Sequence, residues 1–103
     1  MATVTEYHVT VYGNPTGFQN ARADITLLGE DGTLGILRFH DEKMVFPDDS
    51  ENAAGAFMHL PTSMLPTVID LLRWEKPVFF QFQGGHGTFS TGTEPVGEEE
   101  SSK

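Results

Sequence analysis

The segment from residue 61 to 82 constrains the fold most, because in it an amphipathic helix runs directly into an apolar strand. Its apolar side chains recur at the spacing of one helical face, at Leu65, Val68, Ile69 and Leu72. Pro66 lacks a backbone N–H and fits in the first turn, where we expect Ser63 to cap the helix. Pro77 excludes helical geometry for Lys76. The sequence therefore predicts a helix over about residues 64–74 that packs on a core.

Alternation of apolar and polar residues predicts strands on both sides of this helix. The expected strands cover residues 5–12, 21–28, 33–40, 55–60, 78–83 and 88–91. In the second of these we expect Asp24 to point toward water, as a polar residue between inward apolar ones. The turns at residues 29–32 and 84–87 carry glycine, as hairpin turns with positive φ require. Residues 41–54 should form a long loop with a short extended piece at 43–46.

These elements predict an α+β fold, in which a curved antiparallel sheet or half-barrel of about five to seven strands holds one α-helix before the last hairpin. A chain of 103 residues is long enough for one domain with its own core. We expect that domain to span residues 1–96. Residues 97–103 should be an acidic flexible tail, because they are too polar to bury surface.

The formal net charge of −9 comes from 15 acidic and 6 basic residues, and it is concentrated in residues 41–51 and 98–100. Such a surface repels phosphate groups and anionic lipids, which argues against nucleic acid and membranes as partners. The chain contains no cysteine, which excludes disulfides, thiolate metal sites and a cysteine nucleophile. Because the first residues also lack the pattern of a secretion signal, we expect a cytoplasmic protein.

Histidines are the residues best suited to chemistry here, and they stand at positions 8, 40, 59 and 86. A metal or catalytic site would require two or more of His8, His40 and His59 to meet a carboxylate in a cleft. Their spacing shows no recognised ligand motif, and the turn at 84–87 lacks the helix and the lysine of a phosphate-binding loop. The sequence therefore predicts a protein without enzymatic activity, cofactor or metal.

An interaction surface is the remaining functional class, and two groups of residues are candidates for it. Phe79 and Trp74 are aromatic residues that a sheet face or helix end would expose. Asp48, Asp49 and Glu51 belong to the acidic loop. Our leading hypothesis is a noncatalytic protein-interaction module that self-associates, as a homodimer for example, through a sheet edge or the aromatic face and presents the acidic loop to a partner.

Two alternatives remain open at this stage. The half-barrel could bind a small apolar molecule in a cavity lined by Met58, Leu65, Phe80 and Phe82. The acidic surface could instead imitate nucleic acid and bind a basic protein. Neither alternative is excluded by composition or spacing.

The C-terminal third carries two runs, LLRWEKPVFFQF from Leu71 to Phe82 and TGTEPVGEEE from Thr91 to Glu100. These runs resemble the C-terminal half of a group of small uncharacterised bacterial proteins, in which an LRxEKPV run precedes an STGxEPVGE ending. The resemblance implies a bacterial origin and a self-contained domain. It implies no catalytic or binding residues, although an extended segment from Glu94 to Glu98 could lie against a sheet edge.

Overall fold

The computed structural model describes residues 2–13, 20–53 and 55–97, which form eight strands and one α-helix in two open sheets. The elements are β1 (Ala2–Thr3), β2 (Glu6–Val11), β3 (Ala23–Gly29), β4 (Gly32–His40), β5 (Ser50–Asn52), β6 (Gly55–Pro61), a 3-10 turn at Thr62–Met64, α1 (Leu65–Trp74), β7 (Val78–Gln83) and β8 (His86–Thr91). The predicted α+β class, with a single helix before the last hairpin, is confirmed. The strands exceed the expected number because β1 and β5 have only two and three residues, too few to show alternation.

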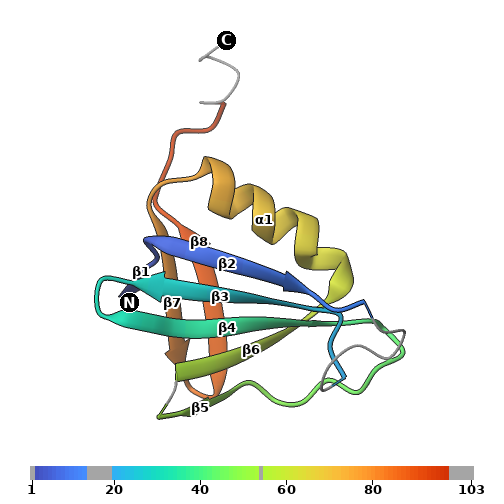
Figure 1. Ribbon diagram of the computed structural model, residues 1–103. Coiled ribbons are helices and arrows are strands. Elements are labelled where there is room, and N and C mark those ends of the chain that lie inside the picture. The colour runs from blue at the N-terminus through green and yellow to red at the C-terminus, as the bar shows by residue number, and fades with distance from the viewer. Residues whose placement is uncertain (1, 14–19, 54, 98–103) are drawn as a thin grey trace.

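The strands divide into a five-stranded sheet in the order β2-β3-β4-β6-β5 and a three-stranded sheet in the order β1-β7-β8 (Figure 1). The larger sheet is not wholly antiparallel as predicted, because β6 runs parallel to β4. The long connection after His40 explains this difference, since it is long enough to return the chain to the other end of the sheet before β6 begins.

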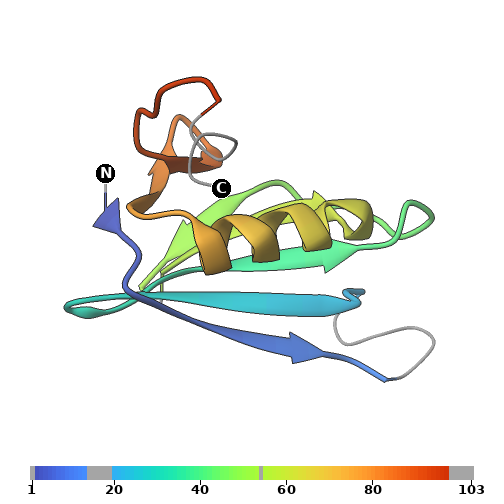
Figure 2. The same ribbon diagram turned by 90° about the horizontal axis from the view of Figure 1, so that it is seen from above.

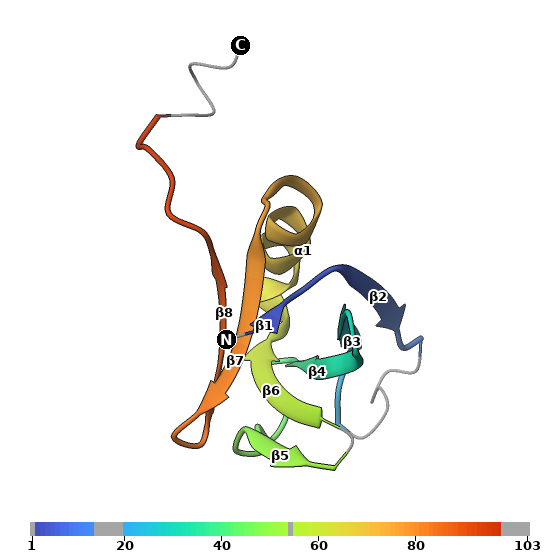
Figure 3. The same ribbon diagram turned by 90° about the vertical axis from the view of Figure 1, so that its left-hand side faces the viewer.

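The core lies between the larger sheet on one side and α1 with the smaller sheet on the other (Figures 2 and 3). Its fully buried side chains come mainly from the two central strands, at Ala23, Ile25, Leu27, Leu37 and Phe39. The two sheets approach closely at Gly35, where an added Cβ would lie 2.7 Å from the ring of Phe80. At Gly87 it would lie 2.8 Å from Cβ of Met58. Phe80 and Met58 therefore each pack against the opposite sheet.

The helix begins differently from the prediction but ends as expected. A 3-10 turn precedes it, so Met64 rather than Ser63 occupies the N-cap position, and no side chain caps the helix. Pro66 lies in the first turn, as predicted. The helix stops at Trp74, where the N–H of Glu75 still bonds to the carbonyl oxygen of Leu71 over 3.0 Å.

The connections confirm the two hairpin turns and correct one loop. Gly32, Gly84 and Gly85 have positive φ. No strand forms at residues 43–46; the extended piece of this loop is β5, because its pairing partner is the start of β6. Among the described residues of the C-terminal segment, 94–97 form no strand, and the tail predicted for 98–103 lies outside the described residues.

Candidate functional site

Strand β2 forms one border of the larger sheet and pairs only with β3. It is six residues long, and its register with β3 shows no shift from Glu6 to Val11. The opposite border is β5, which has three residues and includes the charged Glu51. Among the described residues, β2 is therefore the longer border strand of the larger sheet.

The backbone of β2 directs its hydrogen-bonding groups alternately to β3 and away from the sheet. Tyr12, just after the strand, donates its N–H to the carbonyl oxygen of Arg22 over 3.0 Å. Because bonding alternates along an antiparallel ladder, Thr10 and His8 also direct their groups to β3. The residues between them point outward, where no strand of the described chain pairs with them. These outward residues are Tyr7, Val9 and Val11.

The side chains of the same three residues lie on the face of the sheet that carries the core. Figure 2 shows β2 beside α1 rather than beneath it. Val9 packs against the core, but Tyr7 is 36% and Val11 70% exposed. Alternation in the sequence is enough to place these residues on one side of the strand. The sequence does not show that the helix stops short of this border and leaves part of that face uncovered.

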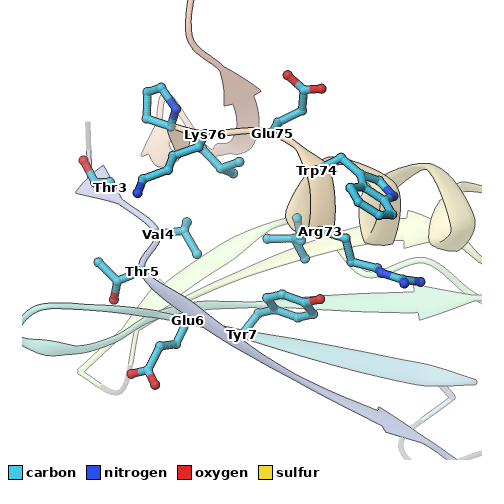
Figure 4. A pocket seen from close by; sticks show the side chains of 12 residues that line it. Thr3, Val4, Thr5, Glu6, Tyr7, Arg73, Trp74, Glu75 and Lys76 are labelled. Atoms are coloured by element: carbon cyan, nitrogen blue, oxygen red, sulfur yellow. The ribbon is translucent and has the colours of Figure 1, made fainter. Parts of the chain in front are cut away.

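A groove of about 500 Å³ lies between the beginning of β2 and the end of α1 (Figure 4). One wall is formed by residues 3–7 and the other by residues 72–78. Tyr7 and Arg73 extend toward one another from opposite walls. Trp74 is 73% exposed, and the guanidinium of Arg73 lies 5.4 Å from the centre of its ring. The groove thus offers exposed aromatic surface directly beside the free backbone of β2.

The charges around this groove differ from the acidic average of the chain. Two basic and two acidic residues line it, so their formal charges balance: Arg73, Lys76, Glu6 and Glu75. The carboxylates of Glu6 and Glu75 point away from its centre in Figure 4. The groove is therefore less negative than the rest of a chain with a net charge of −9. An acidic second molecule would meet less repulsion here than elsewhere.

The five residues suggested as an interface by the sequence do not form one surface. Trp74 is at the groove, and Phe79 is half-buried on β7, in register with Thr3 of β1. Asp48 and Glu51 are exposed near β5, at the opposite border of the larger sheet from β2. Asp49 is turned inward.

Asp49 fastens the acidic loop to both sheets. One carboxylate oxygen accepts the backbone N–H of His59 and the other accepts that of Gly87, each over 2.8 Å. His59 belongs to β6 and Gly87 to β8, so this side chain links the two sheets. Its bonds indicate a structural role for Asp49 rather than contact with a partner.

A polar row crosses the face of the larger sheet that is turned away from α1. Asp24, Arg38 and His59 are successive partners in register. Arg38 donates Nε and a terminal amino group to the two carboxylate oxygens of Asp24, over 2.9 and 3.0 Å. The hydroxyl of Tyr12 donates to the same carboxylate over 2.6 Å. The guanidinium also lies 5.2 Å from the ring centre of Phe57.

Asp24 is only 7% exposed, which contradicts the expectation that it points freely into water. Tyr12 and Arg38 cover it, and a carboxylate buried in this way needs such partners. Burial and the bond to Asp24 raise the pKa of Tyr12 above its ordinary value. The bond to Asp24 raises the pKa of Arg38. This network joins Tyr12, which follows β2, to Asp24 of β3 and Arg38 of β4.

Two of the four histidines meet. The fully buried His40 donates Nδ1–H to the carbonyl oxygen of Asn20, because a carbonyl can only accept. Its Nε2 is then an acceptor, and Nδ1–H of His59 donates to it over 2.8 Å. The ring of Phe46 lies 5.1 Å from that of His40 and covers it. Because both ring nitrogens of His40 are occupied, this pair does not present two ligands to a metal ion.

The pH dependence of stability tests this histidine pair. Burial, and after it the neighbouring His40, lower the pKa of His59 below its ordinary value. The unfolded chain therefore binds more protons than the folded one in mild acid, and stability falls as the pH drops through about 6.5. We expect urea titrations of His59→Asn, which keeps a donor toward His40, to show a weaker loss in this range. The exposed His8→Asn is the control, and an equal slope in wild type and His59→Asn would contradict the assignment.

Among residues 2–13, 20–53 and 55–97, no group of three or more histidine and acidic side chains is placed to hold a metal ion. His8 lies on β2 and does not join the His40–His59 pair. The ten-residue α1 is too short to cross a membrane, and no other helix of the described chain has the length and apolarity for it.

Comparisons with known proteins add no relative. No protein-family model matches the chain. No curated protein matches it. No solved structure matches it either. The free edge of β2 and the groove beside it are therefore the features from which we infer a function.

Proposed function

We propose that this protein is a noncatalytic interaction module that binds an extended segment of a polypeptide along the outer edge of β2. The observation that carries the proposal is the unprotected edge itself. Border strands are usually protected by lysine, proline, a bulge or a covering segment. β2 contains no lysine or proline, keeps its register from Glu6 to Val11, and pairs on one side only within the described chain.

The groove supports this proposal because it provides a binding place for side chains, which the backbone edge alone does not. When an extended peptide adds to a sheet, main-chain bonds give affinity and side-chain pockets beside the edge give specificity. The outward groups of Tyr7, Val9 and Val11 provide the first contribution. The groove between β2 and Trp74 provides the second, because a strand added there directs alternate side chains to the same face as Tyr7.

The two alternatives have less support. For the small apolar molecule, Phe80 of the expected cavity lining is only 4% exposed and packs against Gly35 as part of the core. Imitation of nucleic acid rests on net charge alone, and Asp49 is already bound within the protein. A bacterial origin and a cytoplasmic location remain expectations from the sequence.

A peptide titration tests the proposed function. The probe is the synthetic peptide TEYHVTVY, residues 5–12 of this chain, which already forms a strand against β3 through its other edge. The chain contains one tryptophan, Trp74 at the groove, so its fluorescence reports occupation without a label. With dilute protein we expect a saturable change in emission.

Two control variants distinguish binding at the edge of β2 from nonspecific binding of the peptide. Val11→Pro removes an outward N–H and should abolish binding. Val45→Pro makes the same change at a valine that is 73% exposed, outside β2, and should bind like wild type. If neither the fluorescence emission of Trp74 nor the NMR signals of the Val9 and Val11 amides change when the peptide is added, the proposed function is wrong.

A further inference from the structure

We infer that the partner of the β2 edge is a second copy of this chain, paired antiparallel about a two-fold axis at Val9. This inference rests on the proposed function and adds the identity of the partner and its register. It follows from the direction of the free backbone groups, from the side chains that each register brings together, and from the distribution of charge.

The backbone allows only some registers. Two antiparallel strands exchange bonds between residues whose N–H and C=O groups face one another. On the free edge these are Tyr7, Val9 and Val11, so each must lie opposite one of the same three residues. Two-fold pairings centred on His8, Val9 or Thr10 meet this condition near the middle of the strand.

The side chains select one of these registers. In the register centred on Val9, Tyr7 lies opposite Val11 of the second copy, and Val9 lies opposite Val9 of the second copy. Both exposed apolar side chains of the edge are then paired on the same face, which contributes favourably across a strand pair. The register centred on His8 leaves Val11 beyond the end of β2, and the one centred on Thr10 places Tyr7 opposite Gly13.

The charges do not oppose this pairing, although each copy has a net charge of −9. Glu6 is the only charged residue of β2, and in the register centred on Val9 it lies opposite Tyr12 rather than another carboxylate. The other acidic concentrations are at residues 41–51 and 98–100, outside β2. The edge is thus a place where two acidic molecules can meet without placing like charges in register.

The same pairing explains the groove. A two-fold axis through two equivalent residues on one face stands perpendicular to the sheet, so both helices lie on the same side of one continuous sheet. Val11 of the second copy then lies beside Tyr7 at the border of the groove. Each copy places its most exposed edge residue where the other offers an uncovered aromatic surface.

Molecular mass in solution tests the second copy as partner. Light scattering over a dilution series should show wild type passing from monomer to dimer. Val11→Glu places a carboxylate against Tyr7 at two equivalent positions and should weaken dimerisation roughly tenfold or more. Val45→Glu adds the same charge at a valine of similar exposure, 73% against 70%, and should dimerise like wild type.

Single cysteines test the register, because the natural chain has none. In the inferred dimer the Cα atoms of the two Val9 residues are about 5.5 Å apart, within disulfide range. Cysteines replacing His8 or Thr10 would be about 8 Å from their equivalents, too far to bridge. Under mild oxidation Val9→Cys should become a covalent dimer, whereas His8→Cys and Thr10→Cys should not.

The outcomes separate this inference from the proposed function. If His8→Cys or Thr10→Cys forms the disulfide dimer as fast as Val9→Cys, the register centred on Val9 is wrong. If the protein forms a dimer that dissociates in Phe79→Glu but not in Val11→Glu, the edge of β2 is not its interface. If the protein is monomeric at every concentration but its edge still binds the peptide, the second copy is not the partner, and the proposed function is retained. A monomer that also ignores the peptide overturns both.

Discussion

Replacing Asp24 by alanine is expected to lower the free energy of unfolding by about 3–5 kcal/mol, the usual loss when one partner of a buried ion pair is removed. The side chains of Asp24 and Arg38 are only 10% and 13% exposed and are joined by two hydrogen bonds. Asp24→Ala removes the carboxylate that accepts both bonds from the guanidinium and the bond from the hydroxyl of Tyr12. Urea unfolding followed by circular dichroism measures the loss.

Two comparisons show whether burial is the cause. Asp41 lies 3.5 Å from Arg22 in a more exposed pair, so Asp41→Ala should cost at most about 1 kcal/mol. The double variant Asp24→Leu with Arg38→Met removes both charges and should be more stable than Asp24→Ala. Equal losses for Asp24→Ala and Asp41→Ala would show that the network is as weak as a surface ion pair.

Proline at neighbouring positions of β2 is expected to give opposite results. Thr10 directs its N–H to β3, so Thr10→Pro removes a bond of the ladder and should lower the free energy of unfolding by about 2–4 kcal/mol. Val11 directs its N–H outward and its side chain is 70% exposed. Val11→Pro should therefore change stability by less than about 1 kcal/mol when measured on the monomer.

This pair of variants examines the alternation on which the free edge depends. Both prolines occupy extended backbone and differ in the direction of the lost N–H. Chemical denaturation of dilute samples makes the comparison independent of association. If Val11→Pro proved as destabilising as Thr10→Pro, the outward groups would already be engaged within the folded chain.

The sequence predicts the local elements well because their causes are local. The apolar face of α1, Pro66 in its first turn and the glycines of the two hairpins act within a few residues. Ser63 is the exception. A 3-10 turn precedes α1, so the helix begins at Leu65 and Met64 rather than Ser63 occupies its N-cap position. The parallel pairing of β4 and β6 is also unpredictable locally, since the pairing joins strands separated by a long loop.

The candidate site is harder to predict, because each of its parts depends on strand order. The alternation in β2 shows that Tyr7, Val9 and Val11 share a face, but only the topology makes β2 a border strand. Asp24 looks like an ordinary outward residue until β2 and β4 bring Tyr12 and Arg38 beside it. Trp74 could be proposed from the sequence as an exposed aromatic residue, but its position next to β2 could not.

Backbone amide exchange at β2 tests most directly whether the free edge is the working surface. The amides of Tyr7, Val9 and Val11 point outward, whereas those of His8 and Thr10 bond to β3. Exchange followed by NMR at low and high protein concentration should show the first group slowing strongly as the concentration rises, while the second remains slow throughout. Outward amides that exchange at the same fast rate at every concentration, while light scattering detects a dimer, would contradict the account.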